Sequence, residues 1–183
     1  MAVYFNLAID CNQDENSAKE FAKHFHEFTI ATERFGELPC DSEYTLPRFY
    51  WGNRGTPSDD TDAGDWHKVC VHPNGMSMGG ATPGILDEQN MNHARNELYL
   101  HLQHGLQLGH QFRSALFGWE AQDYIGETDW LDKLESMNQT GKLPKGTEGL
   151  ILNSDMVRNE SVKIQLERFA EGYLWWNAPA PGY

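Results

Sequence analysis

The sequence has no long hydrophobic run and little cysteine. No apolar stretch approaches the ~18 residues that a membrane span requires. The N-terminal residues carry no basic region, and Asp10 interrupts their apolar run, so we expect no signal peptide. Cys11, Cys40 and Cys70 form an odd set without a CxxC pair, which predicts free thiols in a reducing compartment. These absences predict a cytoplasmic protein with no membrane association.

Basic residues are also scarce. The chain has 14 Lys and Arg against 27 Asp and Glu, which gives a formal net charge of −13 at pH 7. Such a surface repels phosphates, so direct binding of nucleic acid or of an anionic membrane is disfavoured. It suits a basic protein partner, although acidity also serves solubility alone.

Signatures of common catalytic sites are missing. The segment 72–84, which is rich in glycine, lacks both the GK[ST] ending of a phosphate-binding loop and the GxGxxG of a dinucleotide-binding turn. The acidic segment 59–65 has its glycine one place too early for a calcium-binding loop that begins at Asp60. No GxSxG, HExxH or activated-cysteine motif occurs. The sequence therefore predicts no catalytic residue.

Apolar periodicity predicts alternating strands and helices. Residues 3–10 alternate between apolar and polar side chains, which is the period of a half-buried strand. Apolar residues then recur at three- and four-residue steps up to Thr32, which predicts a helix opened by Asn12 and Glu15 and ended by Gly36. Residues 37–65 are expected to form a long loop with a short edge strand at 44–51. Further strands are expected at 66–73, 112–121, 149–153 and 173–177, and further helices at 86–109, from 128 and at 162–172.

These elements predict one α+β domain over residues 1–177 and a short tail, rich in proline and glycine, over 178–183. The amphipathic first strand favours a mixed or antiparallel sheet of about five strands, with helices packed mainly on one face. Strands of parallel sheets, by contrast, are usually apolar on both faces. The alternation of strands and helices leaves a three-layer α/β fold as the alternative.

Histidines are concentrated in the helix expected at 86–109. One arc of about 80° on this helix holds His93, Glu97, His101 and His104. Apolar residues such as Leu98 and Leu102 lie on the opposite side, so the arc is interpreted as the solvated face of an amphipathic helix. Two alternatives remain open. One is a site for zinc or another transition metal, helped by His24 or His26 of the first helix, and the other is a pH-dependent partner contact.

Acidic residues gather in two stretches, one of them mixed with aromatic residues. The candidate partner-binding residues of the two stretches are Asp59, Asp60, Asp62 and Asp65, and Glu120, Asp123, Tyr124, Glu127, Asp129 and Trp130. Carboxylates steer association with a basic surface, while aromatic side chains provide buried anchors. The simpler interpretation is a solvated surface with a tryptophan in the core.

Two functional hypotheses follow. The first is an acidic cytoplasmic inhibitor without a cofactor, of the bacterial toxin-immunity or anti-defence type. It would block the active-site cleft of a basic toxin or nucleic-acid-processing enzyme. The second is a metal-dependent enzyme or small-molecule binder that uses the histidine and glutamate face of the helix.

Overall fold

The computed structural model describes residues 3–26, 28–33, 36–45, 67–78, 88–119, 121, 125, 128–143 and 149–176. The strands in these ranges are β1 (Val3–Asp10), β2 (Thr29–Thr32), β3 (Gly36–Thr45), β4 (Lys68–Pro73), β5 (Ser77–Met78), β6 (Ser114–Trp119), β7 (Ile151–Asn153), β8 (Glu167–Ala170) and β9 (Tyr173–Trp175). The helices are α1 (Glu15–Phe25), α2 (Glu88–Gln107), α4 (Thr128–Thr140) and α5 (Glu160–Lys163), and η1 is a short 3-10 helix over Ser154–Met156. Among these helices, none has both the length and the apolar character that crossing a bilayer would need.

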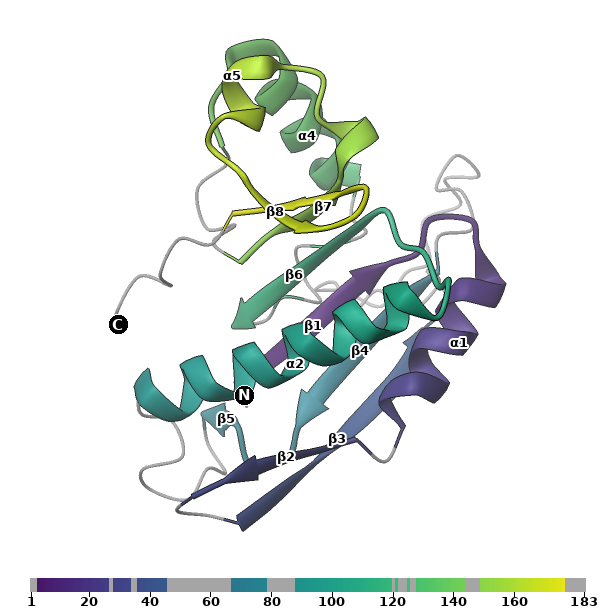
Figure 1. Cartoon of the computed structure of the whole chain (residues 1–183), viewed down its shortest axis with the longest axis vertical. Coiled ribbons are helices and arrows are strands. Elements are labelled where there is room, and N and C mark those ends of the chain that lie inside the picture. Colours follow the sequence, from purple (N-terminus) through teal and green to yellow (C-terminus); the bar gives the residue numbers. More distant parts are fainter. Residues whose placement is uncertain are drawn as a thin grey trace, which may run out of the picture.

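The strands form an antiparallel sheet (Figure 1). Its order is β2-β3-β4-β1-β6-β7-β9-β8, and β5 pairs with β1 off this path. Every pairing between described strands is antiparallel, which confirms the α+β class and leaves no parallel pair for the α/β alternative. The expected five strands were an undercount, because nine are described. Strands β2, β5 and β8 are two to four residues long, too short for their alternation to stand out in the sequence.

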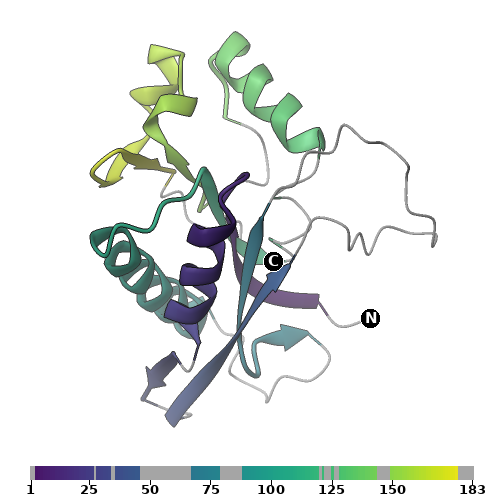
Figure 2. The ribbon, with the colours of Figure 1, turned by 90° about the vertical axis from the view of Figure 1, so that its right-hand side faces the viewer.

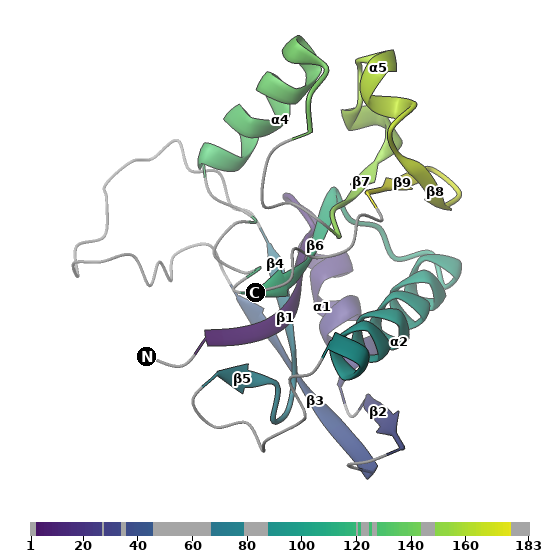
Figure 3. The same ribbon diagram turned by 90° about the vertical axis from the view of Figure 1, so that its left-hand side faces the viewer.

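Helices cover both faces of the sheet rather than mainly one. The alternation along β1 sends Leu7 into a core cluster with α1 and α2, and Ala8 into a second cluster with α4 and α5. Buried Phe25 of α1 and Met137 of α4 belong to these two opposite clusters. Figures 2 and 3 show α1 and α2 side by side along the strands, away from α4. The expectation of one covered face is therefore corrected, because the central strands carry buried apolar side chains on both sides.

Two predicted helices are shorter than their apolar spacing indicated. Helix α1 is capped by Asp14, not Asn12, and it ends at Phe25. Phe28, which continues the apolar pattern, immediately precedes β2 and packs against the same core as Ile30 of that strand. The last helix likewise stops at Lys163, and the chain turns into the β8–β9 hairpin. Three- and four-residue spacing marks a shared buried side but does not distinguish a long helix from a helix followed by a strand.

The two edges of the sheet are β2 and β8. Strand β2 pairs with β3 over only four residues, from Thr29 to Thr32. Strand β8 pairs with β9 through a register shift between Arg168 and Ala170, which is a bulge or irregularity. Its first two residues, Glu167 and Arg168, are exposed.

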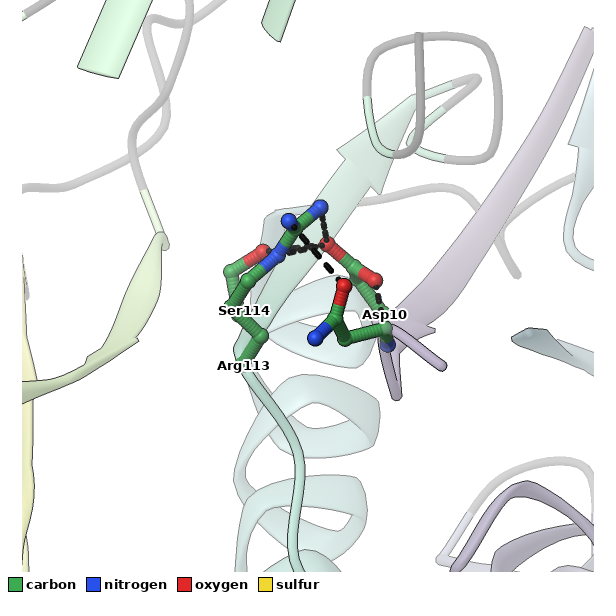
Figure 4. Close-up of polar contacts among 4 residues, drawn as sticks. Asp10, Arg113 and Ser114 are labelled. Carbon is green, nitrogen blue, oxygen red and sulfur yellow. Dashed lines mark hydrogen bonds and ion pairs between the residues drawn. The ribbon is translucent and has the colours of Figure 1, made fainter. Parts of the chain in front are cut away.

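A buried ion pair joins β1, β6 and the turn into α1 (Figure 4). The side chain of Asp10 is 1% exposed, and its Oδ2 accepts hydrogen bonds from Nε and Nη2 of Arg113 at 2.7 and 2.5 Å. Its Oδ1 accepts from the backbone N–H of Asn12 at 2.8 Å, and Ser114 Oγ lies 3.4 Å from Oδ2. Asn12 has a positive φ of 56°, so the carboxylate stabilises the left-handed turn that starts the path to α1.

Replacing Asp10 by Ala should lower the free energy of unfolding by about 3–5 kcal/mol, because it leaves the half-buried Arg113 guanidinium without its carboxylate. The control is Glu160→Ala, which removes an exposed ion pair with Lys163 and should cost less than about 1 kcal/mol. Urea unfolding of both variants gives the comparison. Equal, small losses would show that the Asp10 pair has no structural role.

Gly105 permits the close approach of α1 and α2. A Cβ atom at this position would lie 2.7 Å from Cε1 of Phe21 and 3.3 Å from Cδ2 of His24. Phe21 is fully buried, and its ring packs edge-on against Phe112 and His110, so it has little room to move away. The helix contact therefore depends on the absence of a side chain at residue 105.

Gly105→Ala should destabilise the protein, although the same change in an ordinary helix interior stabilises it by about 1 kcal/mol. Overpacking against Phe21 costs about 1–3 kcal/mol and outweighs that gain. Gly118→Ala is the matched control, because a Cβ there meets nothing within 4 Å. If chemical denaturation shows Gly105→Ala to be the more stable variant, the close contact is not a constraint.

Candidate functional sites: a histidine cluster and an acidic groove

Most predicted partner-binding residues lie outside the described part of the chain. Those residues are Asp59, Asp60, Asp62, Asp65, Glu120, Asp123, Tyr124 and Glu127. Asp129 and Trp130 lie in the first turn of α4, and their side chains are likewise outside the description. The segment 46–66, which includes the first acidic stretch, connects β3 to β4, and the strand residues Thr45 and Lys68 pair with each other.

His24 and His101 join α1 to α2. The His24 Nε2 lies 2.9 Å from the carbonyl oxygen of His101, and the His101 Nε2 lies 2.8 Å from the carbonyl oxygen of His24. The two rings stack with centroids 4.0 Å apart and an interplanar angle of 8°. Phe28 stacks with the His101 ring as well, at 4.0 Å and 13°. The His101 ring is therefore held by stacking contacts from two aromatic neighbours and by one hydrogen bond.

These hydrogen bonds determine which ring nitrogen carries a proton. A carbonyl oxygen only accepts, so Nε2 of both His24 and His101 must be the N–H donor. In a neutral imidazole, Nδ1 then keeps its lone pair. The carbonyl of His24 lies in the last turn of α1, where backbone carbonyls run out of intrahelical partners, so His101 also caps that helix end.

The histidine cluster extends beyond this pair. The exposed His104 ring lies 5.3 Å from the His24 ring, and the His110 ring lies 6.0 Å from it, both centroid to centroid. One ligand nitrogen from each of His24, His101 and His104 lies within 4.8 Å of the others. Burial lowers the pKa of both His24 and His101, and the neighbouring histidines add to this, although the hydrogen bonds to the backbone oppose it.

The predicted arc on α2 does not coincide with its solvated face. His93 Nε2 lies 2.6 Å from the carbonyl oxygen of Ala31 in β2, and His101 contacts α1, so both are half-buried. The exposed positions include Leu100, which is 61% exposed, and His104. Periodicity located the buried side correctly, since Leu98 and Leu102 are fully buried, but it could not show that α1 and β2 cover part of the polar side.

Of the residues proposed to hold a metal, the structure brings His101 and His104 together with His24, which was expected only as a helper. His93 and Glu97 do not belong to any cluster of three candidate ligands among the described residues, and neither does His26. From the sequence, His24 was proposed only as a histidine of the first predicted helix, alongside His26. Nothing in the sequence indicated that its ring would stack with that of His101.

A second candidate site is a groove between α4 and η1. It is a hollow of about 480 Å³ lined by Asp132, Leu134, Glu135, Asn138, Asp155, Met156 and Arg158. Three of these residues are carboxylates and one is a cation, so the groove is net negative. Arg158 forms an ion pair with Glu135, and both side chains are at least half exposed. Asp132 and Glu135 belong to the second acidic stretch of the sequence, whereas Asp155 comes from a distant segment and was not predicted.

Asn138 holds the two walls of this groove together. Its Nδ2 donates to the carbonyl oxygen of Met156 at 2.9 Å, and its Oδ1 accepts from the backbone N–H of Arg158 at 2.7 Å. The carbonyl oxygen of Asn138 also accepts a hydrogen bond from Asn159 Nδ2 at 2.8 Å. Three hydrogen bonds centred on one residue hold η1 and the following turn against α4, and with them the backbone positions that carry the carboxylates.

The described cysteines are unsuited to nucleophilic catalysis. Cys11, Cys40 and Cys70 are free and buried, as the odd count predicted. Burial raises the pKa of Cys40 to about 12, and burial together with the Asp10 carboxylate raises the pKa of Cys11 further. The thiolate is the reactive form of cysteine, so the raised pKa values disfavour the reactive form of Cys11 and Cys40 near neutral pH.

The histidine pair should make stability depend on pH. The folded-state pKa values of His24 and His101 lie below the unfolded value of about 6.5, so the unfolded chain binds protons more readily. The two histidines contribute fully to the free energy of unfolding above pH 6.5. This contribution is lost as the pH falls through their folded-state pKa values. Urea unfolding at pH 7.5 and 5.5 should show this loss, and it should be smaller in a His24→Gln, His101→Gln variant.

The control is His26→Gln, which replaces an exposed histidine outside the cluster and should behave like the wild type. If the double variant loses as much stability as the wild type between the two pH values, the histidine pair is not the source of the loss.

Comparison of the chain with protein-family models, with curated proteins and with solved structures finds no match.

Proposed function

We propose that this chain is an acidic cytoplasmic binding protein that inhibits a basic protein by covering its active-site cleft. The partner would be a bacterial toxin or a nucleic-acid-processing enzyme, as in toxin-immunity or anti-defence inhibition. The observation that carries the proposal is the groove between α4 and η1, where Asp132, Glu135 and Asp155 surround a preformed hollow. The net charge of −13 supports a basic partner.

The groove has the composition of a docking site for a positively charged side chain. Its volume of about 480 Å³ falls in the ~300–1,000 Å³ range of pockets that enclose ligands. Met156 and the buried Leu134 also line the groove, and this apolar lining suits the aliphatic stem of a lysine or arginine. The carboxylates would then pair with the charged end of that side chain.

The predicted acidic and aromatic stretch leads directly into this groove. Asp129 and Trp130 occupy the first turn of α4, and Asp132 and Glu135 follow within two turns on the same helix. We therefore extend the proposed interface from residues 120–130 to the groove, with Trp130 and Tyr124 as aromatic anchors. Asp59, Asp60, Asp62 and Asp65, between β3 and β4, form a second acidic arm in the proposal. Carboxylates at the rim speed association, while those enclosed by the partner slow its release.

The test compares two neutralised variants. The groove variant is Asp132→Asn, Glu135→Gln and Asp155→Asn, and the control is Glu20→Gln, Glu37→Gln and Glu171→Gln, at exposed sites elsewhere. Both raise the net charge equally and nearly preserve side-chain shape. A partner captured from host lysate at low and high salt, and identified by mass spectrometry, is purified and its affinity and activity are measured with each variant.

We expect the groove variant to lose affinity by about 30-fold or more, as when enclosed charge pairs are broken, and to lose inhibition. The control should bind more slowly but dissociate at the wild-type rate, since only long-range steering is reduced. Equal losses in both variants would assign binding to overall charge instead of the groove. A partner that binds without losing its own activity would contradict inhibition.

A further inference from the structure

The histidine cluster offers a second site, separate from the acidic groove. It brings together His24 from the last turn of α1 and His101 and His104 from successive positions on one side of α2. One nitrogen from each ring lies within 4.8 Å of the other two. Residues spaced by three on a helix are neighbours on its surface, so α2 supplies two converging imidazoles and α1 supplies the third.

The hydrogen bonds of the pair prepare these rings to bind a metal. His24 and His101 each donate Nε2–H to a backbone carbonyl, which leaves both Nδ1 atoms with a lone pair. Histidine ligands in metalloproteins almost always make such a bond through the second nitrogen, because it fixes the ring orientation and increases ligand basicity. A neutral imidazole is the form that coordinates a metal.

The donor set selects the class of metal. Imidazole nitrogens suit zinc, copper, nickel and iron, whereas calcium and magnesium prefer oxygen ligands. Zinc with three histidines completes its tetrahedron with water, and His104 is exposed, so the site is open to solvent on that side. Nitrogens 2.0–2.1 Å from a tetrahedral zinc ion are about 3.4 Å apart. The ligand nitrogens of the three rings lie within 4.8 Å of one another, so the rings must move closer together to bind one zinc ion.

One ring must turn when the metal enters. A coordinated metal lies near the plane of each imidazole, but the His24 and His101 rings are parallel within 8°, so no point lies in both planes. His101 is held by Phe28 on its other face and keeps its orientation. The remaining ring neighbours of His24 are Phe25, His104 and His110, at wider centroid distances of 5.3–6.0 Å, so His24 is the ring that turns. Its hydrogen bond to the His101 carbonyl must change as it turns, whereas His101 keeps its own.

From this arrangement we propose that a divalent transition metal, with zinc as the reference ion, binds His24, His101 and His104. The bound ion clamps the end of α1 to α2 next to Gly105, where an added Cβ would meet Phe21 and His24 of α1. In the metal-free protein the stacked pair fills the same place. This role is independent of inhibition through the groove, so either proposal can fail without the other.

The test uses protein without an affinity tag, stripped with a chelator and titrated with zinc chloride by calorimetry. We expect one zinc ion per chain and a higher Tm with zinc, because a ligand that binds only the folded state stabilises it. Cobalt chloride provides a second probe, since the visible absorption of cobalt distinguishes four-coordinate from six-coordinate sites. A four-coordinate spectrum is expected.

His104→Ala is the decisive variant, because His104 is exposed and its removal should leave the fold intact. It should weaken zinc binding by at least about tenfold and abolish the rise in Tm. The matched control, His26→Ala, removes an exposed histidine outside the cluster and should bind zinc within about twofold of the wild type. No zinc binding by the wild type, or equal binding by the two variants, would overturn the proposal.

Discussion

The buried pair between Asp10 and Arg113 is the constraint on which the rest of the structure depends. Asp10 lies at the end of the central strand β1, where a carboxylate without a partner would be strongly unfavourable. Arg113 immediately precedes β6, and its guanidinium pairs with the Asp10 carboxylate. This pair fixes the register in which Asp10 faces Ser114. The same carboxylate binds the N–H of Asn12 and shapes the turn that leads to α1. The position of α1 against α2, and with it the histidine cluster, follows from this junction.

The sheet separates two chemically different regions of the molecule. Alternating side chains of β1 and β6 place one core cluster under α1 and α2 and another under α4 and α5. The first side carries the stacked histidines, and the second carries the carboxylates of the groove. Because the two regions are built on different helices and different core clusters, a change in one need not disturb the other.

Sequence periodicity predicted the elements whose side chains alternate over many residues. Strand β1 and helix α2 begin and end within two residues of their expected bounds. Strand β3 was not predicted over most of its length, because Pro39 and three acidic residues interrupt the alternation of its buried positions. Strand β8 was predicted as helix, because Leu166 and Phe169 are spaced by three residues. The histidine pair and the groove wall at Asp155 depend on contacts between distant segments, across 77 residues in the case of His24 and His101. Local patterns carry no information about such contacts.

The edge strands of the sheet are the places where the backbone could pair with another protein. An open antiparallel sheet exposes unpaired N–H and C=O groups at its edge strands, and these can template the addition of another strand. Here β2 offers only four residues, and β8 is interrupted at Ala170 and begins with the exposed charges of Glu167 and Arg168. Short, irregular and charged edges resist intermolecular strand pairing. The described edge strands therefore disfavour polymerisation of the chain through backbone pairing. Recognition of another molecule then depends on side chains.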